Sequence, residues 1–339
     1  MNNASPIGRQ QVTGRLSTWD QLNSRSWPTL LIGNGMSINI WSSFGYQLLL
    51  EEAELNSAAA QLFSDLNTAN FELVLEGLWH ADRVLDALKQ PVEVVEKLYA
   101  HVRDALFEAV RNVHVPWNSV PTPTLARIAA VLDQHRLVFT LNYDLLTYWS
   151  VMDTTSPTYI GDYFWSPGWR FDPYDCGLAP GRTGVLYLHG GVHLWQETAT
   201  GVTGKWTQGN EGNLLSSLAD RFRANRDRQP LMVSEGTSAQ KMGIIRRSEY
   251  LSFALRQLVA DTSNIVIFGA DFGSQDDHVV AAIRAGRRRN IAVSVLPGSN
   301  DDNIATMARY TAKLPDQDLW FFDSRTHPLG DPGLTVQPG

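Results

Sequence analysis

The sequence is poor in cysteine and in long apolar runs. Cys176 is the only cysteine among 339 residues, which excludes an intrachain disulfide and a zinc site built from several cysteines. No run approaches the ~20 apolar residues that a helix needs to cross a bilayer. The first ten residues, MNNASPIGRQ, lack the apolar core of a signal peptide. These absences predict a cytoplasmic protein with no membrane partner.

An excess of positive charge is also missing. The chain carries 28 basic and 35 acidic residues, for a net charge of −7. Nucleic-acid binding requires a basic face that displaces condensed counterions, so no direct nucleic-acid partner is expected. The cluster Arg284, Arg287, Arg288 and Arg289 is an exception. Its place at a predicted helix end favours a solvated face whose cations complement the helix dipole.

Short apolar runs bounded by Gly, Asn or Pro predict buried strands. Helical patterns such as 125–134 and 276–286 lie between most of these runs. Continuous apolar strands that alternate with helices are typical of a parallel sheet covered on both faces. We therefore predict an α/β fold with a Rossmann-like, doubly wound, mainly parallel sheet. The predicted strands are 29–32, 136–140, 185–188, 231–234, 264–268, 291–296 and 319–322.

Residues 45–115 interrupt this alternation with two amphipathic helical patterns. Each places its apolar residues at helical spacing on one stripe, which indicates a helical insertion after the first strand. It would form a small lobe or cap, and it is a candidate gate or assembly surface. The two stripes are Phe71, Val74, Leu75, Leu78, Leu85 and Leu88, and then Val95, Leu98, Val102, Leu106 and Val110.

The remaining segments complete a single-domain organisation. Residues 1–27 are interpreted as an N-terminal extension, 28–330 as the one folded domain and 331–339 as a C-terminal tail. The stretch 151–182 is rich in Trp, Tyr, Pro, Gly and Asp. Because it is too aromatic for a linker, we expect an ordered loop near the edge of the sheet.

The first predicted strand ends in a glycine-bracketed turn. In LLIGNGMSINI, residues 30–40, the apolar run stops at Gly33, Asn34 and Gly35, and the chain becomes polar at Ser37. Such a turn can present backbone N–H groups to a phosphate, or it can be a tight turn with no ligand. The sequence of this stretch by itself leaves both interpretations open.

Three further strand ends carry polar residues. Asn142 and Asp144 follow one strand, His189 another, and Gly269 and Asp271 a third. In open parallel sheets, ligands bind beyond the carboxyl ends of the strands, so these residues are expected to meet at one edge. The alternatives are that Asn142 and Asp144 cap the next helix and that His189 is structural.

No metal site is predicted. His189 and His193 are four residues apart, which is a ligand spacing on a helix. Gly190 and Gly191 lie between them and argue against a helix there. The same glycines would allow a ligand ring to approach His189 closely, whereas His193 is expected to pack within the fold.

These motifs together resemble the sirtuin-like NAD-consuming family, in particular prokaryotic members linked to anti-phage defence. The motifs are G-N-G-x-S (33–37), T-x-N-Y-D (140–144), L-H-G (188–190) and F-G-x-x-F (268–272). NFELVL (70–75) and VSEGTS (233–238) are similar to an uncharacterised prokaryotic branch of that group. The resemblance covers residues 28–296.

The resemblance implies a role for each matching residue. Asn142 corresponds to the catalytic asparagine, His189 to the catalytic histidine and Asp144 to the neighbouring acid on the nicotinamide side. The resemblance also implies two turns that bind NAD. The turn after the first strand would contact the phosphates and the ribose, and the turn after strand 264–268 would contact the adenosine half. These cofactor-binding residues are Gly33, Asn34, Gly35 and Ser37 in the first turn, and Gly269 and Asp271 in the second.

Two departures from the family bear on the activity. Asn34 stands where family deacylases usually carry alanine, and one cysteine cannot build their four-cysteine zinc ribbon. The expected function is therefore an NAD glycohydrolase that depletes NAD in anti-phage defence, acting as a homo-oligomer or with a partner defence protein. The alternatives are a module that binds NAD or ADP-ribose without turnover and, third, a deacylase or ADP-ribosyltransferase.

Overall fold

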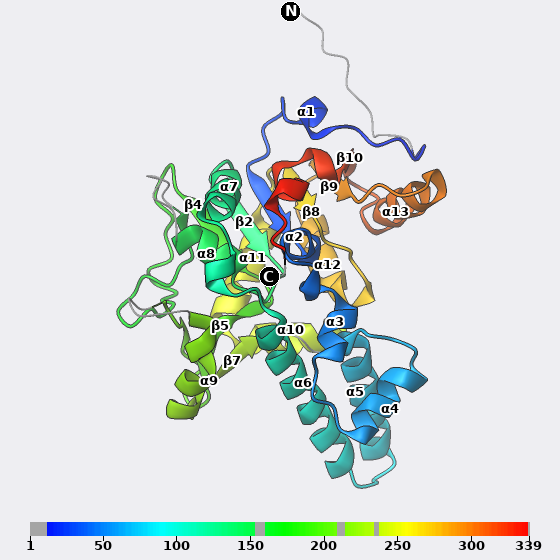
Figure 1. Ribbon diagram of the computed structural model, residues 1–339, viewed down its shortest axis with the longest axis vertical. Helices are drawn as coiled ribbons and strands as arrows, with labels where there is room; N and C mark the ends of the chain where they lie inside the picture. The colour runs from blue at the N-terminus through cyan, green and yellow to red at the C-terminus, as the bar shows by residue number, and fades with distance from the viewer. Residues whose placement is uncertain (1–11, 153–159, 209–213, 234–236, 338–339) are drawn as a thin grey trace, which may run out of the picture.

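A seven-stranded sheet forms the centre of the protein (Figure 1). The computed structural model describes residues 12–152, 160–208, 214–233 and 237–337. The strand order is β10-β9-β8-β1-β2-β4-β3, and every neighbouring pair is parallel. The strands are β1 (Thr29–Ile32), β2 (Leu137–Thr140), β3 (Ile160–Gly161), β4 (Thr183–Tyr187), β8 (Ile265–Phe268), β9 (Asn290–Val295) and β10 (Asp318–Asp323).

The central strands are buried along their whole length. Every residue of β1, β2 and β8 is buried, which requires cover on both faces of the sheet. Leu31 of β1 lies in register between Phe139 of β2 and Ile267 of β8. The predicted strands in this sheet are confirmed to within two residues at each end, because continuous apolar runs between turn residues are a strong local signal.

One predicted strand is misplaced. Residues 231–234 were expected in the parallel sheet, but β7 (Arg228–Met232) belongs to a second, antiparallel sheet with β5 (Gly190–Glu197) and β6 (Thr203–Lys205). The chain turns from β4 into β5 at Gly190, whose φ is +75°. A Cβ there would lie 2.0 Å from the carbonyl oxygen of Leu231, so glycine is needed where β7 approaches.

Helices connect the parallel strands, as such crossovers require. The last part of the chain alternates regularly: β8, α12, β9, α13 and β10 follow one another. In the described ranges, no helix combines the length and the apolarity needed to cross a membrane. Outside the insertion the helices are α1 (Trp19–Leu22), α2 (Asn34–Ile40), α7 (Thr122–Leu132), α8 (Leu146–Met152), α9 (Leu214–Ala224), α10 (Ser238–Arg247), α11 (Glu249–Ala260), α12 (Asp277–Ala285) and α13 (Asn300–Lys313).

The helical insertion lies between β1 and β2 and forms a lobe at one end of the molecule (Figure 1). Its apolar stripes are buried near the sheet but not at the far tip. Leu88 is 64% exposed, and Leu85 and Val95 are only half-buried, so the predicted stripes are too long. The far ends of the two long helices are exposed because no other described part of the protein packs against them there. Its helices are α3 (Tyr46–Glu51), α4 (Ser57–Asp65), α5 (Phe71–Ala87) and α6 (Glu93–Val113).

The two ends of the chain pack onto this domain. Ser17 forms a bridge with Phe322 of β10, and α1 buries Trp19. Near the C-terminus, the backbone N–H of Val336 donates to the carbonyl oxygen of Ile40. The described parts of the predicted extension and tail are therefore integral to the fold.

The aromatic stretch contributes β3, the outermost strand of the sheet. This placement agrees with the predicted position at the edge, although residues 153–159 lie outside the described residues.

The basic cluster Arg284, Arg287, Arg288 and Arg289 is only partly the solvated face that was predicted. Arg289 is 4% exposed and pairs with the buried Asp261, because the chain enters β9 there and carries this side chain inward.

Candidate active site

A cavity of about 470 Å³ lies beyond the carboxyl ends of β1, β2 and β8. It gathers residues from turns that are far apart in the sequence. Ser37 is the only predicted site residue that does not line it. The predicted residues that line the cavity are Gly33, Asn34, Gly35, Asn142, Asp144, His189, Gly269 and Asp271.

The glycines of the first turn bring two backbone turns into contact. The N–H of Gly33 donates to the carbonyl oxygen of Phe268, and the N–H of Gly35 donates to that of Gly269, at 2.9 and 2.8 Å. A Cβ on Gly33 would lie 2.4 Å from the Cα of Ala270. These two amides are therefore already used by the end of β8 and by the turn that follows it. The tight-turn interpretation accounts for the glycines.

Ser37 joins the two polar residues of the β2 turn. The side-chain amide of Asn142 donates to Ser37 Oγ at 2.8 Å, and Ser37 Oγ donates to Asp144 Oδ2 at 2.5 Å. Ser37 is fully buried, so its hydroxyl orients Asn142 rather than lining the cavity. Asn142 Oδ1 is buried and has no hydrogen-bond partner within the described ranges. This oxygen is an acceptor available to a ligand hydroxyl.

Asp144 has both of its carboxylate oxygens engaged. Oδ1 accepts from the backbone N–H of Leu146, the first residue of α8, as the alternative interpretation of Asp144 as a helix cap predicted. Burial raises the pKa of Asp144, while the hydrogen bonds from Ser37 and Leu146 lower it. The geometry makes Asp144 a fixed acceptor that holds Ser37, at the base of the cavity.

The helical insertion is tied directly to this turn. His114, the residue after α6, accepts a hydrogen bond at Nε2 from the backbone N–H of Leu145, at 2.7 Å. Its Nδ1 donates to the carbonyl oxygen of Val115, which fixes the tautomer. Burial lowers the pKa of His114 to about 4, so the ring is neutral at pH 7 and suited to these two bonds.

The insertion also supplies the apolar wall of the cavity. Phe71 of α5 and Leu106 and Val110 of α6 line it opposite the polar turns. All three side chains are buried within the hydrophobic core. The cavity therefore combines an apolar wall with the polar side chains of Asn142 and His189.

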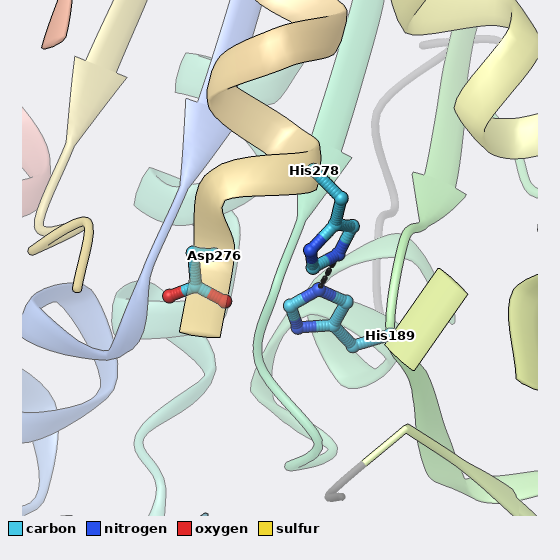
Figure 2. Close-up of side chains that lie close together, drawn as sticks. All are labelled: His189, Asp276 and His278. Atoms are coloured by element: carbon cyan, nitrogen blue, oxygen red, sulfur yellow. Dashed lines mark hydrogen bonds between the residues drawn. The ribbon is translucent and has the colours of Figure 1, made fainter. Parts of the chain in front are cut away.

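His189 lies at the corner between β4 and β5 and is 2% exposed. Its Nε2 is 2.9 Å from Nε2 of His278, near the start of α12, and the two rings face each other in Figure 2. Burial lowers the pKa of His189 well below its usual value, and the nearby Lys241 and His278 lower it further. His189 is therefore neutral at pH 7, as a proton acceptor must be.

The glycines after His189 do not serve the predicted purpose. Gly190 packs against the β7 backbone, and a Cβ on Gly191 would lie 3.2 Å from the ring of His193. They leave room for the protein itself rather than for a ligand. His193 is confirmed as a packing residue, since it is fully buried with its ring 4.7 Å from that of Tyr148.

His189, Asp276 and His278 have ligand atoms within 4.8 Å of one another, close enough to share a metal ion. The sequence spacing did not suggest this group, because its members come from different elements. Lys241 Nζ lies 3.0 Å from Asp276 Oδ1, and its side chain is 1% exposed. This buried ammonium already neutralises the carboxylate, and its charge disfavours a second cation nearby.

A second cavity, of about 550 Å³, adjoins the first. Gly35, Gly269, Asp271 and Arg309 line both cavities and so form their common rim. Arg309 of α13 pairs with Asp271 across this rim. An anion bound at this rim would have to replace the Asp271 carboxylate as the partner of the Arg309 guanidinium.

Four residues of the site were missed by the sequence reasoning. His278 and Asp276 follow the β8 turn in GADFGSQDDH, so extending the strand-end argument through that turn would have included them. Lys241 and Arg309 lie within helices, and no local pattern distinguishes them from other helical cations.

The structure is thus an α/β fold with a cavity, lined in part by polar side chains, at the carboxyl edge of its parallel sheet. Residues 30–329 match the model of a domain of unknown function, DUF4917. The chain belongs to this family. No curated protein matches the chain.

Proposed function

We propose that this protein is an NAD glycohydrolase with a sirtuin-like, Rossmann-type NAD site, which cleaves NAD to nicotinamide and ADP-ribose. The observation that carries the proposal is that Asn142 and His189 line one cavity. Motif resemblance singled out these residues independently of any contact between them. The apolar wall of the helical insertion fits the nicotinamide ring, and the adjoining cavity fits the adenosine half.

The bond to be broken joins the ribose C1′ to a pyridinium nitrogen. Nicotinamide leaves as a neutral molecule, so no general acid is needed at the leaving group. The Asn142 carbonyl oxygen would accept a hydrogen bond from a ribose hydroxyl and hold the sugar. Water would form the new C1′–O bond while its proton passes to neutral His189. Atoms and charge balance without any redox step.

The apolar wall has a second consequence in this mechanism. An oxocarbenium-like ribose reacts with any water that reaches it, so a closed cavity limits attack to one positioned molecule. The insertion is also tied to the Asn142 turn through His114. Movement of the insertion would therefore be transmitted to Asn142, which supports the proposal that this lobe gates activity in an anti-phage defence effector.

The test is to incubate the purified chain with NAD and to measure free nicotinamide and ADP-ribose. His189→Ala and Asn142→Ala should each lower the rate by about 10²–10⁴-fold, the usual worth of general base catalysis. His193→Ala is the control, because that ring lies outside the cavity. If the purified chain needs an activating trigger, the same comparison is made in cells that contain it. NAD levels are then measured in cells that express the wild type and in cells that express His189→Ala.

Two outcomes would replace this proposal. Binding of NAD measured by calorimetry, without nicotinamide release in either setting, would favour a sensor module. Nicotinamide release that depends on added acyl-lysine or protein acceptor would favour a deacylase or ADP-ribosyltransferase. Normal turnover by folded His189→Ala would remove His189 from the mechanism.

A further inference from the structure

His278 is the closest polar partner of the proposed base. Its Nε2 is 2.9 Å from His189 Nε2, and its side chain is 6% exposed. Two neutral imidazoles that meet through these atoms share one proton, so one nitrogen donates and the other accepts. Which ring donates decides which nitrogen of His189 keeps a free lone pair.

The surroundings of His278 decide the direction of this hydrogen bond. A backbone hydrogen bond with Gln275 raises the pKa of His278, which is the effect of a carbonyl acceptor. Nε2 already faces His189, so Nδ1 is the nitrogen left to donate. Ser238 Oγ, which can also accept, lies 3.4 Å from Nδ1. With its proton on Nδ1, His278 presents a lone pair at Nε2.

We propose that His278 is a positioning residue that accepts a hydrogen bond from His189 Nε2–H and so leaves the Nδ1 lone pair of His189 free for the cavity. In Figure 2 the second ring nitrogen of His189 faces away from His278. No described residue forms a hydrogen bond to it. The catalytic part of this inference rests on the proposed function, whereas the hydrogen bond itself does not.

The Lys241–Asp276 ion pair supports the same arrangement. Lys241 lies on α10 with Ser238, and Asp276 immediately precedes α12. Their salt bridge therefore joins α10 to the start of α12, the helix that carries His278. The nearby ammonium also disfavours a proton shared as an imidazolium, since it lowers the pKa of both histidines. Both rings remain neutral, which the donor–acceptor pairing requires.

The direct test is ¹⁵N NMR of the histidine rings, because protonated and lone-pair nitrogens differ in chemical shift. In the wild type, His189 should be protonated on Nε2 and His278 on Nδ1, with assignments from His189→Gln and His278→Gln. In His278→Phe, the His189 signals should lose this preference. Protonation of His189 on Nδ1 in the wild type would overturn the inference.

The kinetic test uses the same variants. His278→Phe should lower kcat for NAD by about tenfold or more, within the ~10²–10⁴-fold worth of a general base, and should leave KM unchanged. His278→Gln keeps a side-chain acceptor and should recover part of the loss. His135→Phe is the matched control, since His135 is also buried and bonded to a carbonyl, that of Trp27.

Two results would overturn the positioning role of His278. Equal kcat in the wild type and folded His278→Phe would overturn it, and so would loss of the His189 pattern on adding a chelator, which would indicate a shared metal. If the wild type releases no nicotinamide, the proposed function fails. The NMR result then supports or overturns the positioning hydrogen bond by itself.

Discussion

The backbone N–H of Gly35 donates to the carbonyl oxygen of Gly269 at 2.8 Å, and this bond joins the two turns that form the rim of both cavities. A Cβ on Gly35 would lie 2.7 Å from the Cα of Gly269. Backbone atoms cannot move aside as a flexible side chain can. The separation of the turns is therefore set by the absence of a side chain at Gly35.

Gly35→Ala should lower the free energy of unfolding by about 1–3 kcal/mol, the usual cost of overpacking a close contact. Thermal unfolding monitored by circular dichroism would measure it. Gly243→Ala is the control, because a Cβ at that helical position meets nothing within 4 Å. Equal destabilisation by the two variants would contradict the close approach.

Ser37→Ala should reduce NAD cleavage by misplacing Asn142 and should destabilise the fold. The buried Asp144 carboxylate loses its hydroxyl donor, and an unsatisfied buried group costs about 1–3 kcal/mol. Initial rates and thermal midpoints would test both effects. Ser150→Ala is the matched control, since Ser150 is also fully buried and its hydroxyl donates within α8, to the carbonyl oxygen of Leu146. A normal rate for Ser37→Ala would contradict the orienting role.

Arg309→Ala should raise the KM for NAD by about tenfold, because charge-assisted hydrogen bonds to a pyrophosphate at the common rim would be lost. Steady-state kinetics would measure KM and kcat separately. Arg288→Ala provides a control of similar chemistry, since Arg288 is an exposed arginine paired with Asp318 away from the cavities. If KM is unchanged, the anion does not lie at this rim.

Stability should fall on acidification below about pH 6.5. Burial lowers the pKa of His135 and His114 to about 4 and that of His193 and His327 to about 3. Histidines of the unfolded chain have pKa values of ~6.5. Between pH ~6.5 and the lower pKa values of the folded state, the unfolded chain therefore binds more protons than the folded protein, and acidification favours unfolding. Each histidine contributes a slope of up to ~1.4 kcal/mol per pH unit.

Urea unfolding at pH 7.5, 6.0 and 5.0 would measure this loss. His135→Phe removes one titrating ring and should make the pH dependence shallower, whatever its effect at pH 7.5. His80→Phe is the matched substitution at an exposed histidine, whose side chain is 59% exposed. A stability that is constant from pH 7.5 to 5.0 would show that these rings are not held neutral.

The sequence by itself determined the layers of the fold and the edge at which the polar residues gather. Apolar runs such as 29–32 and 264–268 identify strands because their pattern is local, and parallel strands carry their carboxyl ends to one edge. The place of Asn142 and His189 beside one cavity follows from that rule. The helical insertion was equally clear, since its periodicity extends over several turns.

Only the tertiary structure decided how those residues pair. His189 and His278 are 89 residues apart, and their hydrogen bond depends on where α12 begins relative to the β4–β5 corner. The use of the Gly33 and Gly35 amides by the β8 turn, and the burial of Arg289, depend likewise on the path of distant segments. Local patterns record which face a residue prefers. They do not record which distant residue a side chain contacts, because that contact is set by the packing of the whole chain.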